Sequence, residues 1–172
     1  LQEIDSFAFS ETLIENFFIP SHMKKINDLS FFKCIDLKKV EIATNSELEL
    51  IGFDAFGECS SIESISFPPS LKVVSSIAFK NCGNLKDVEI DPNIQLDKLD
   101  NFLFYSTSIE EFSIPASVTS ICSGAFNDCT NLKRIEIPKN SKLEVIFSSA
   151  FRNTQIESIF FPSNLVDLKD GW

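Results

Sequence analysis

Residues 117–138 read SVTSICSGAFNDCTNLKRIEIP, and this stretch contains a motif that recurs along the whole chain. Its first part runs from Ile121 to Phe126, five residues later, and on to Cys129, three residues after that. Its second part, residues 132–138, follows the pattern L-x-x-I-x-I-P. The last apolar residues of that pattern alternate with a polar one, which is the period of a strand with one buried face. Proline lacks the N–H that a strand ladder needs, so it marks the end of the strand.

The three positions of the first part occur seven times. The phenylalanine has an aliphatic residue five positions before it and a cysteine or threonine three positions after it. We call it the anchor phenylalanine. Its copies are Phe9, Phe31, Phe56, Phe79, Phe104, Phe126 and Phe151, at intervals of 22, 25, 23, 25, 22 and 25 residues. This regular repeat predicts a solenoid, in which stacked rungs build a common core because one rung cannot bury its apolar face alone.

The connector between the strand of one repeat and the next apolar pair alternates in length. It spans four residues after Phe67 but six after Ile90, so the structural unit is a pair of rungs, about 47 residues long. We predict one domain over residues 1–172, with seven complete rungs and a partial eighth at residues 165–168. The expected fold is a mostly β, right-handed superhelix with parallel stacked strands and short 3-10 or helical turns.

The full repeat, L-x-x-I-x-I-P followed by L-x-x-I-x-x-x-A-F-x-x-C, resembles the BspA-like subclass of leucine-rich repeats over essentially the whole chain. Two features depart from the family pattern. The glycine expected after the second apolar pair survives only as Gly52, and Leu103 replaces the small residue before Phe104. The resemblance implies a leucine-rich-repeat solenoid of a kind found largely on the surfaces of bacteria and protozoan parasites, where some members are adhesins for host matrix proteins.

The composition excludes several classes of function. The chain has 172 residues, with 15 Lys and Arg against 25 Asp and Glu, and a formal net charge of −10. A nucleic-acid-binding protein needs a basic surface, so neither DNA nor RNA is an expected partner. Apolar runs such as residues 17–19 and 159–161 are too short for membrane insertion by this segment, and residues 1–172 contain no signal-peptide pattern.

Catalytic chemistry finds little support in the sequence, so we expect no enzyme and no cofactor. His22 is the single histidine, and neither G-x-S-x-G nor a P-loop occurs. Four cysteines occupy the last position of the motif: Cys34, Cys59, Cys82 and Cys129. Because other repeats have threonine there, we favour buried thiols that share hydrogen bonds with the backbone. A ladder of disulfides or metal ligands is the alternative, although no C-x-x-C pair points to zinc.

The residue after the first apolar position of each strand alternates in charge without a break. In chain order this column reads Glu15, Lys38, Glu63, Lys86, Glu110, Lys133 and Glu157. In a parallel stack each charge would lie between two opposite ones, and like charges there would repel. We therefore interpret this column as structural, since it fixes the register of one rung on the next.

The strand face carries the candidate binding residues, because solenoids usually bind partners there. Two further columns should point outward: the residue directly after the alternating charge, and the residue two positions beyond that. Asp87 and Glu111 belong to the first of these columns and Glu89 to the second, at the one place where the pairing of charges lapses. Our hypothesis is that these carboxylates meet a basic patch on a partner or a divalent cation. The alternative is a hydrated patch flanked by Lys86 and Arg134.

Two aromatic residues, Phe18 and Phe160, also belong to an outward column and are further partner-binding candidates. They are six rungs apart, roughly 29 Å at ~4.8 Å per rung, and cannot form one patch. We expect each to pack against terminal residues or a neighbouring copy.

The leading functional interpretation is a non-enzymatic protein–protein interaction module for cell-surface adhesion, exposed to the extracellular space, that binds a host or matrix protein. The alternative is a cytoplasmic leucine-rich-repeat scaffold that binds a protein partner. Neither end of the sequence shows a polar cap, although solenoids need caps for solubility. We therefore expect a fragment of a longer repeat array, or self-association through the uncapped ends.

Overall fold

The structure is a computed structural model that describes residues 1–171. Within these residues the regular elements are short parallel strands, and no helix occurs. In chain order the strands are β1 (Glu3–Ile4), β2 (Asn16–Ile19), β3 (Lys25–Ile26), β4 (Lys39–Ile42), β5 (Leu50–Ile51), β6 (Ser64–Phe67), β7 (Val73–Val74), β8 (Asp87–Ile90), β9 (Lys98–Leu99), β10 (Glu111–Ser113), β11 (Ser120–Ile121), β12 (Arg134–Glu136), β13 (Val145–Ile146) and β14 (Asp167–Leu168).

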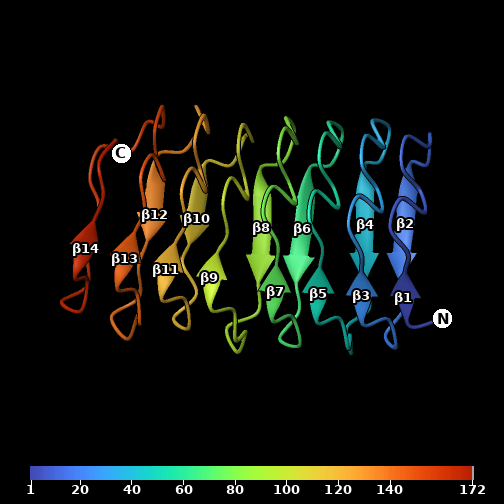
Figure 1. Cartoon of the computed structure of the whole chain (residues 1–172), viewed down its shortest axis with the longest axis horizontal. Helices are drawn as coiled ribbons and strands as arrows, with labels where there is room; N and C mark the ends of the chain where they lie inside the picture. Colours follow the sequence, from blue (N-terminus) through green and yellow to red (C-terminus); the bar gives the residue numbers. More distant parts are fainter. Residues whose placement is uncertain (172) are drawn as a thin grey trace.

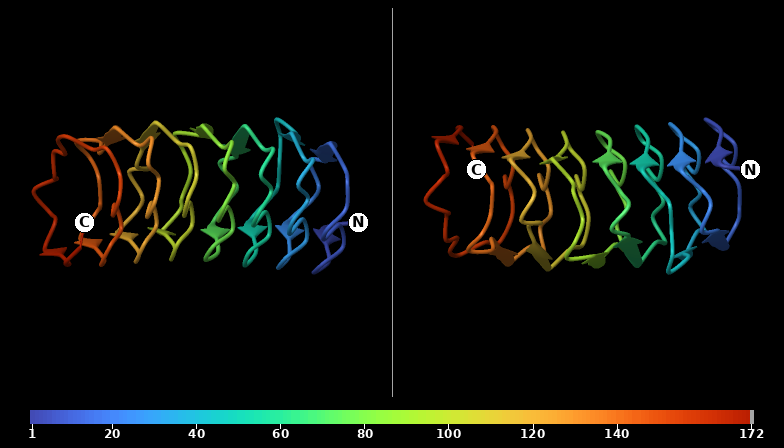
Figure 2. Two further views of the ribbon diagram at one scale, coloured as in Figure 1. Left: turned by 90° about the horizontal axis from the view of Figure 1, so that it is seen from above. Right: turned by 90° about the horizontal axis from the view of Figure 1, so that it is seen from below.

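Each rung, numbered 1 to 7 by its anchor phenylalanine, begins with a two-residue strand and continues through a series of turns. In rungs 1 to 6 it ends with a longer strand of three or four residues. Equivalent strands of successive rungs pair in parallel, as in the pairing of β1 with β3 and of β2 with β4. The rungs stack into an elongated solenoid, with the chain ends at opposite ends of the stack (Figure 1, Figure 2). The predicted repeat solenoid of parallel stacked strands is confirmed.

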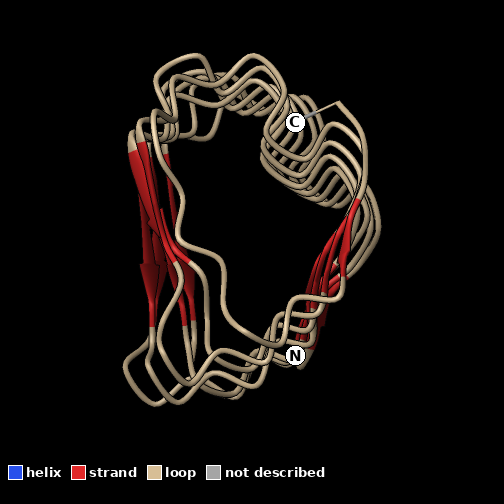
Figure 3. Cartoon of the chain, turned by 90° about the vertical axis from the view of Figure 1, so that its left-hand side faces the viewer, coloured by secondary structure: helices blue, strands red, loops and turns tan. Residues whose placement is uncertain are grey.

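The anchor phenylalanines form one continuous column of rings inside the solenoid. In cross-section, the long strands and the two-residue strands form two walls, which the turns join on one side and the connectors on the other (Figure 3). We call the wall of long strands the strand wall. The rings of successive anchors lie 5.0–5.8 Å apart between centroids, in near-parallel stacks. From Phe31 to Phe126 every anchor is fully buried. Seven of the 18 phenylalanines of the sequence therefore have a structural role in one column.

The turn segments differ from the short helical turns that the sequence suggested. The residues two positions before and two positions after every anchor have a positive φ, between 51° and 65°. The first set is Phe7, Leu29, Asp54, Ile77, Phe102, Gly124 and Ser149, and the second is Glu11, Lys33, Glu58, Asn81, Ser106, Asp128 and Asn153. A left-handed residue interrupts a right-handed helix, so the segment becomes a chain of tight turns.

This alternation gives the turns a ladder of their own. In rung 1 the N–H groups of Phe7, Phe9 and Glu11 donate to carbonyls of the next rung, at 2.7–3.2 Å. The intervening N–H groups of Ala8 and Ser10 close turns within the rung. A left-handed conformation costs an L-residue about 1–2 kcal/mol. The ladder repeats in every rung up to rung 6, so the surrounding structure enforces that conformation whatever side chain is present.

The cysteine column is a set of free, buried thiols, as the sequence favoured. Each of the four donates its S–H to the carbonyl of the anchor in the preceding rung, at 2.9–3.1 Å. Thr12 and Thr154 occupy the same position and donate instead to the anchor carbonyl of their own rung. The position therefore suits a small side chain with one donor.

The alternating connectors divide the strand wall into pairs of rungs. A short connector closes as a single turn, in which Leu71 donates its N–H to the carbonyl of Pro68. The long strands of the two rungs that it links pair fully, as β6 does with β8. Across a long connector the long strands of the two rungs pair at one residue or not at all. β4 and β6 share one residue pair, and within residues 1–171 β8 does not pair with β10 and β12 pairs only with β10. We call these three boundaries seams.

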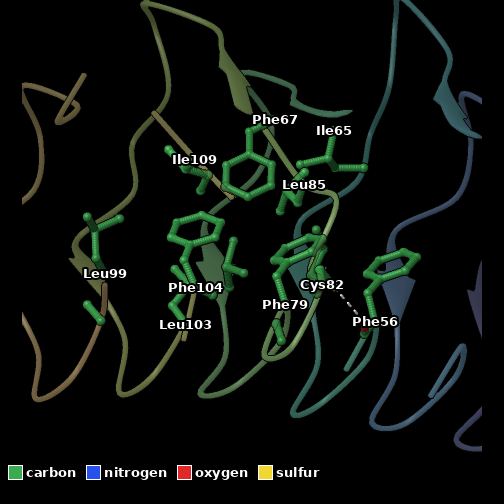
Figure 4. Packing of buried hydrophobic residues seen from close by; sticks show 14 of the residues in the cluster. Phe56, Ile65, Phe67, Phe79, Cys82, Leu85, Leu99, Leu103, Phe104 and Ile109 are labelled. Carbon is green, nitrogen blue, oxygen red and sulfur yellow. Dashed lines mark hydrogen bonds between the residues drawn. The ribbon is translucent and has the colours of Figure 1, made fainter. Parts of the chain in front are cut away.

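The seam between rungs 4 and 5 also divides the wall of two-residue strands, since β7 and β9 do not pair within the described residues. Here Leu103 occupies a position that is alanine in most rungs, and it is fully buried. The ring of Phe67 packs on both Phe79 and Phe104 (Figure 4). These side chains fill space between rungs 4 and 5. The turn ladder nevertheless continues across the boundary, through the 3.1 Å bond from the Phe79 N–H to the Leu103 carbonyl.

Candidate binding surfaces

The strand wall carries the charge pattern that the sequence predicted, in part as direct ion pairs. Within the alternating column, Lys38 lies 2.9 Å from Glu15 and Lys133 lies 3.9 Å from Glu110. Both pairs cross a fully paired boundary between rungs. In the outward columns Lys39 contacts Glu41 and Arg134 contacts Glu136, each within one strand. Exposed pairs of this kind contribute about 0–1 kcal/mol each, so their effect is on register and surface charge more than on stability.

The three candidate carboxylates lie on opposite sides of the central seam. Asp87 and Glu89 project from β8 and Glu111 from β10, and all three side chains are exposed. Within residues 1–171 none of them forms an ion pair. The structure therefore places them along the two edges of an unpaired boundary.

A small groove occupies this seam, and we call it the central groove. Its volume is about 250 Å³, and it is lined by Val88 and Ile90 from β8, Phe112 and Ser113 from β10, and the carboxylates of Glu111 and Glu136. The sequence identified the acidic residues but not the groove between them. Among its apolar residues, Val88 and Ile90 are half-buried and Phe112 is buried.

Geometry gives the divalent-cation half of the hypothesis no support. Among residues 1–171 no group of three or more His, Cys, Asp or Glu side chains is arranged to hold a metal ion. Asp87 and Glu89 are on one strand and Glu111 on another that does not pair with it, so the three oxygens that a metal would require do not converge.

Both aromatic candidates face outward. Phe18 is 58% exposed on β2 and Phe160 is 86% exposed. Phe18 lines a hollow with Glu41 and Ser66 over the first seam. Phe160 lines a larger groove of about 1080 Å³ over the third seam, between β12 and residues 155–160. Packing of either against a second copy stays a prediction.

The turn side exposes apolar side chains that the sequence analysis did not select. Phe7, Phe53, Phe102 and Phe147 are 38–60% exposed. Aligning the positions next to the anchors would have shown that several rungs carry a large apolar residue just outside the motif.

Two of the column thiols, those of Cys82 and Cys129, offer no reactive site. Burial raises the pKa of the Cys82 thiol and of the Cys129 thiol above the ordinary range, and both side chains are fully buried. A thiol is nucleophilic only as the thiolate. These groups therefore serve the packing and hydrogen bonding of the rungs.

A solenoid of short parallel strands, with one apolar column per turn and an exposed, charged strand wall, defines the leucine-rich-repeat class of proteins. The model of a family described as BspA type leucine rich repeat region, with six copies, matches residues 2–96 and 49–171. The chain belongs to this family, which confirms the resemblance inferred from the repeat. No curated protein matches the sequence.

Solved structures share the fold at low sequence identity. A leucine-rich repeat protein from Eubacterium ventriosum matches with a TM-score of 0.76 at 20% identity, over 99% of this chain and 45% of that one. The pneumococcal vaccine antigen PcpA matches with a TM-score of 0.55 at 19% identity, over 98% and 64%. A leucine rich cell surface protein from Faecalibacterium prausnitzii gives 0.61 at 19% identity, over 98% and 61%. The chain thus spans less than two thirds of the length of each.

Leucine-rich-repeat domains generally serve as protein-interaction scaffolds, and their binding sites are surfaces more than enclosed pockets. No helix within residues 1–171 is long and apolar enough to cross a membrane.

Proposed function

We propose that this chain is a non-enzymatic, protein-binding module of a cell-surface adhesin, and that it meets its protein ligand through the strand wall. The observation that carries the proposal is the central groove. Glu111 lines this groove of about 250 Å³, and Asp87 and Glu89 are exposed on the neighbouring strand β8; none of the three carboxylates forms an ion pair within residues 1–171.

A lysine or arginine side chain of the ligand fits this combination. Its aliphatic stem would cover the half-buried Val88 and Ile90, while its charged head reaches Glu111 at the rim. Long basic side chains commonly bury their stems on apolar surface and keep the charge near water. Around this point the wall presents a cluster of negative charge, which attracts a basic patch and speeds association at low ionic strength.

The surface location rests on the relatives. One of the similar structures is described as a cell surface protein and another as a pneumococcal vaccine antigen. Both share the fold with this chain over nearly all of its length. Surface exposure and adhesion are therefore the proposed setting of the protein-binding wall.

The second candidate, a cytoplasmic scaffold, is favoured by one observation. All five cysteines are free, and four of them donate hydrogen bonds that a disulfide would remove. Titration of accessible thiols in unfolded protein from the native source separates the two settings. Fully reduced cysteines favour the cytoplasm, whereas surface labelling of intact cells favours the adhesin.

The test of the binding wall uses a panel of purified extracellular matrix proteins and surface plasmon resonance. The triple variant Asp87→Asn, Glu89→Gln, Glu111→Gln is compared with a control triple, Glu11→Gln, Glu47→Gln, Glu144→Gln, whose side chains are also exposed. We expect the first triple to weaken the binding of a ligand found in the panel by about tenfold or more, mainly through slower association. Unchanged affinity, or equal losses in both triples, would exclude the central groove as the contact.

A further inference from the structure

A second hollow lies on the turn side of rungs 4 to 7, away from the strand wall. We call it the turn hollow. It has a volume of about 520 Å³, and the residues that matter for its chemistry are Phe102, Tyr105, Asn127, Asp128, Arg152 and Asn153. All belong to the positions immediately around the anchors, on the outer surface of the turns.

The placement of the Phe102 ring in the hollow depends on the residue two positions before the anchor in the next rung. This position is Phe102 in rung 5 but Gly124 in rung 6. A Cβ atom on Gly124 would lie 2.4 Å from the Phe102 ring. Glycine therefore lets this ring lie over the backbone of rung 6. It also suits the backbone there, since Gly124 has a φ of 65°.

The floor of the hollow is aromatic. Phe102 is 39% exposed, and the ring of Tyr105 packs edge-on against it, with centroids 5.9 Å apart and planes at 70°. Tyr105 is the single tyrosine of the chain. Together the two rings form the apolar floor of the hollow, which is open to solvent.

A fixed polar group stands beside the rings. Asn153 Nδ2 donates to Asp128 Oδ1 at 2.6 Å. The bond from Asn153 lowers the pKa of the Asp128 carboxyl, so this acceptor is ionised and held in place at neutral pH. Lys80 and Arg152 flank the hollow as donors, and neither forms an ion pair within the described residues.

The backbone around the hollow is already paired. The N–H of Asn81 donates to the Tyr105 carbonyl, and that of Ser106 to the Asn127 carbonyl, at 2.8 and 3.0 Å. The N–H of Asp128 donates to the Arg152 carbonyl at 2.9 Å. A peptide that binds by strand addition needs free main-chain groups, and these are engaged in the turn ladder. Recognition must come from side chains.

We propose that the turn hollow is a carbohydrate-binding site. A pyranose ring has an apolar C–H face, which suits the exposed aromatic floor, and hydroxyl groups that both donate and accept hydrogen bonds. The Asp128 carboxylate accepts from such hydroxyls, and Arg152, Lys80 and Asn153 donate to them. The volume suits one or two sugar rings. This site is separate from the central groove, and it does not depend on the proposed protein ligand.

The test is ligand-observed saturation-transfer NMR with the full chain and millimolar glucose, galactose, N-acetylglucosamine and N-acetylneuraminic acid, one at a time. We expect transfer to the ring protons of at least one sugar, and a shift of the Tyr105 ring signals, which are assigned without ambiguity because the chain has one tyrosine. No transfer to any of the four sugars would overturn the proposal.

Two variants and a matched control locate the site. Phe102→Ala and Asp128→Asn should each reduce transfer to the bound sugar at least about fivefold. The control is Phe7→Ala, which removes a phenylalanine from the same position of rung 1, also at positive φ (62°) and 60% exposed, but outside the hollow. Binding that survives both hollow variants, or that Phe7→Ala reduces equally, would contradict the assignment. The surface variant Asp128→Asn keeps the test decisive if Phe102→Ala unfolds the protein.

Discussion

At the scale of single residues, the anchor column dominates stability. Phe79 lies between Phe56 and Phe104, with its ring fully buried and 5.3–5.8 Å from its neighbours in the column. Phe79→Ala should lower the free energy of unfolding by about 3–5 kcal/mol, because the stack cannot close over the space left by the ring. Urea denaturation followed by circular dichroism measures this loss.

The neighbouring thiol provides the comparison for that experiment. Cys82→Ser should cost only about 1–2 kcal/mol, since a hydroxyl can donate to the Phe56 carbonyl as the thiol does at 3.1 Å. Threonine at the same position in other rungs shows that a hydroxyl fits. Equal costs for Phe79→Ala and Cys82→Ser would mean that the columns are assigned wrongly.

The folded structure disfavours the ionised form of the Asp54 carboxyl. Burial raises the pKa of its carboxyl, and one carboxyl oxygen, Oδ1, is buried without a hydrogen-bond partner. A raised pKa means that the ionised form is disfavoured in the folded state. The cost is fully present above the folded pKa and disappears as pH falls through it towards the unfolded value.

Asp54→Asn should therefore stabilise the protein at pH 7. Asparagine also tolerates the positive φ of 53° at this position. Thermal unfolding at a series of pH values should show the variant with the higher midpoint at pH 7 and a difference that shrinks as the pH approaches 4. A variant that is less stable than the parent at pH 7 would show that the charge of Asp54 is needed in the folded state.

At the scale of elements, the connectors decide where the sheets hold together. Short connectors close as one turn, and the long strands of the two rungs that they link pair in register. Long connectors carry two more residues, and the long strands of the two rungs that they link pair at one residue or not at all. The central seam adds a second cause, because Leu103 and Phe67 fill space between rungs 4 and 5. The alternation in connector length was visible in the sequence, but its consequence for pairing was not, since pairing depends on how the core fills.

Leu103→Ala tests the packing of this seam. Leu103 is fully buried. Because Phe67 would still hold rungs 4 and 5 apart, removing the leucine side chain leaves a cavity. We expect a loss of about 2–4 kcal/mol in urea denaturation. A loss below about 1 kcal/mol, together with new protection of the β8 amides, would instead mean that the leucine alone opens the seam.

At the scale of the whole molecule, the sequence predicted the architecture and the strand-wall residues but not the shape of the binding surfaces. The anchor column was predictable because seven copies of one buried residue repeat at fixed intervals. The left-handed turn positions were not, because residues such as Phe7, Leu29 and Ile77 carry no preference for positive φ. The turn hollow likewise depends on one glycine, Gly124, and on the ring that lies over it.

Pairs of rungs build the solenoid, and the seams between the pairs leave strand edges open on the strand wall. Alternate residues of a parallel strand direct their backbone groups to opposite neighbours. In β8, the Asp87 N–H donates to the carbonyl of Glu63 in rung 3, so the N–H groups of Val88 and Ile90 face the central seam. In β6, the N–H groups of the equivalent residues, Ile65 and Phe67, face the paired strand β8.

Amide hydrogen exchange of the full chain, measured residue by residue with NMR, tests this claim directly. Exchange reports which backbone hydrogen bonds are formed and how often they open. We predict slow exchange for the amides of Ile65 and Phe67, and exchange faster by at least about a hundredfold for those of Val88 and Ile90. Equal protection at these four amides would show a continuous sheet and would contradict the paired-rung architecture.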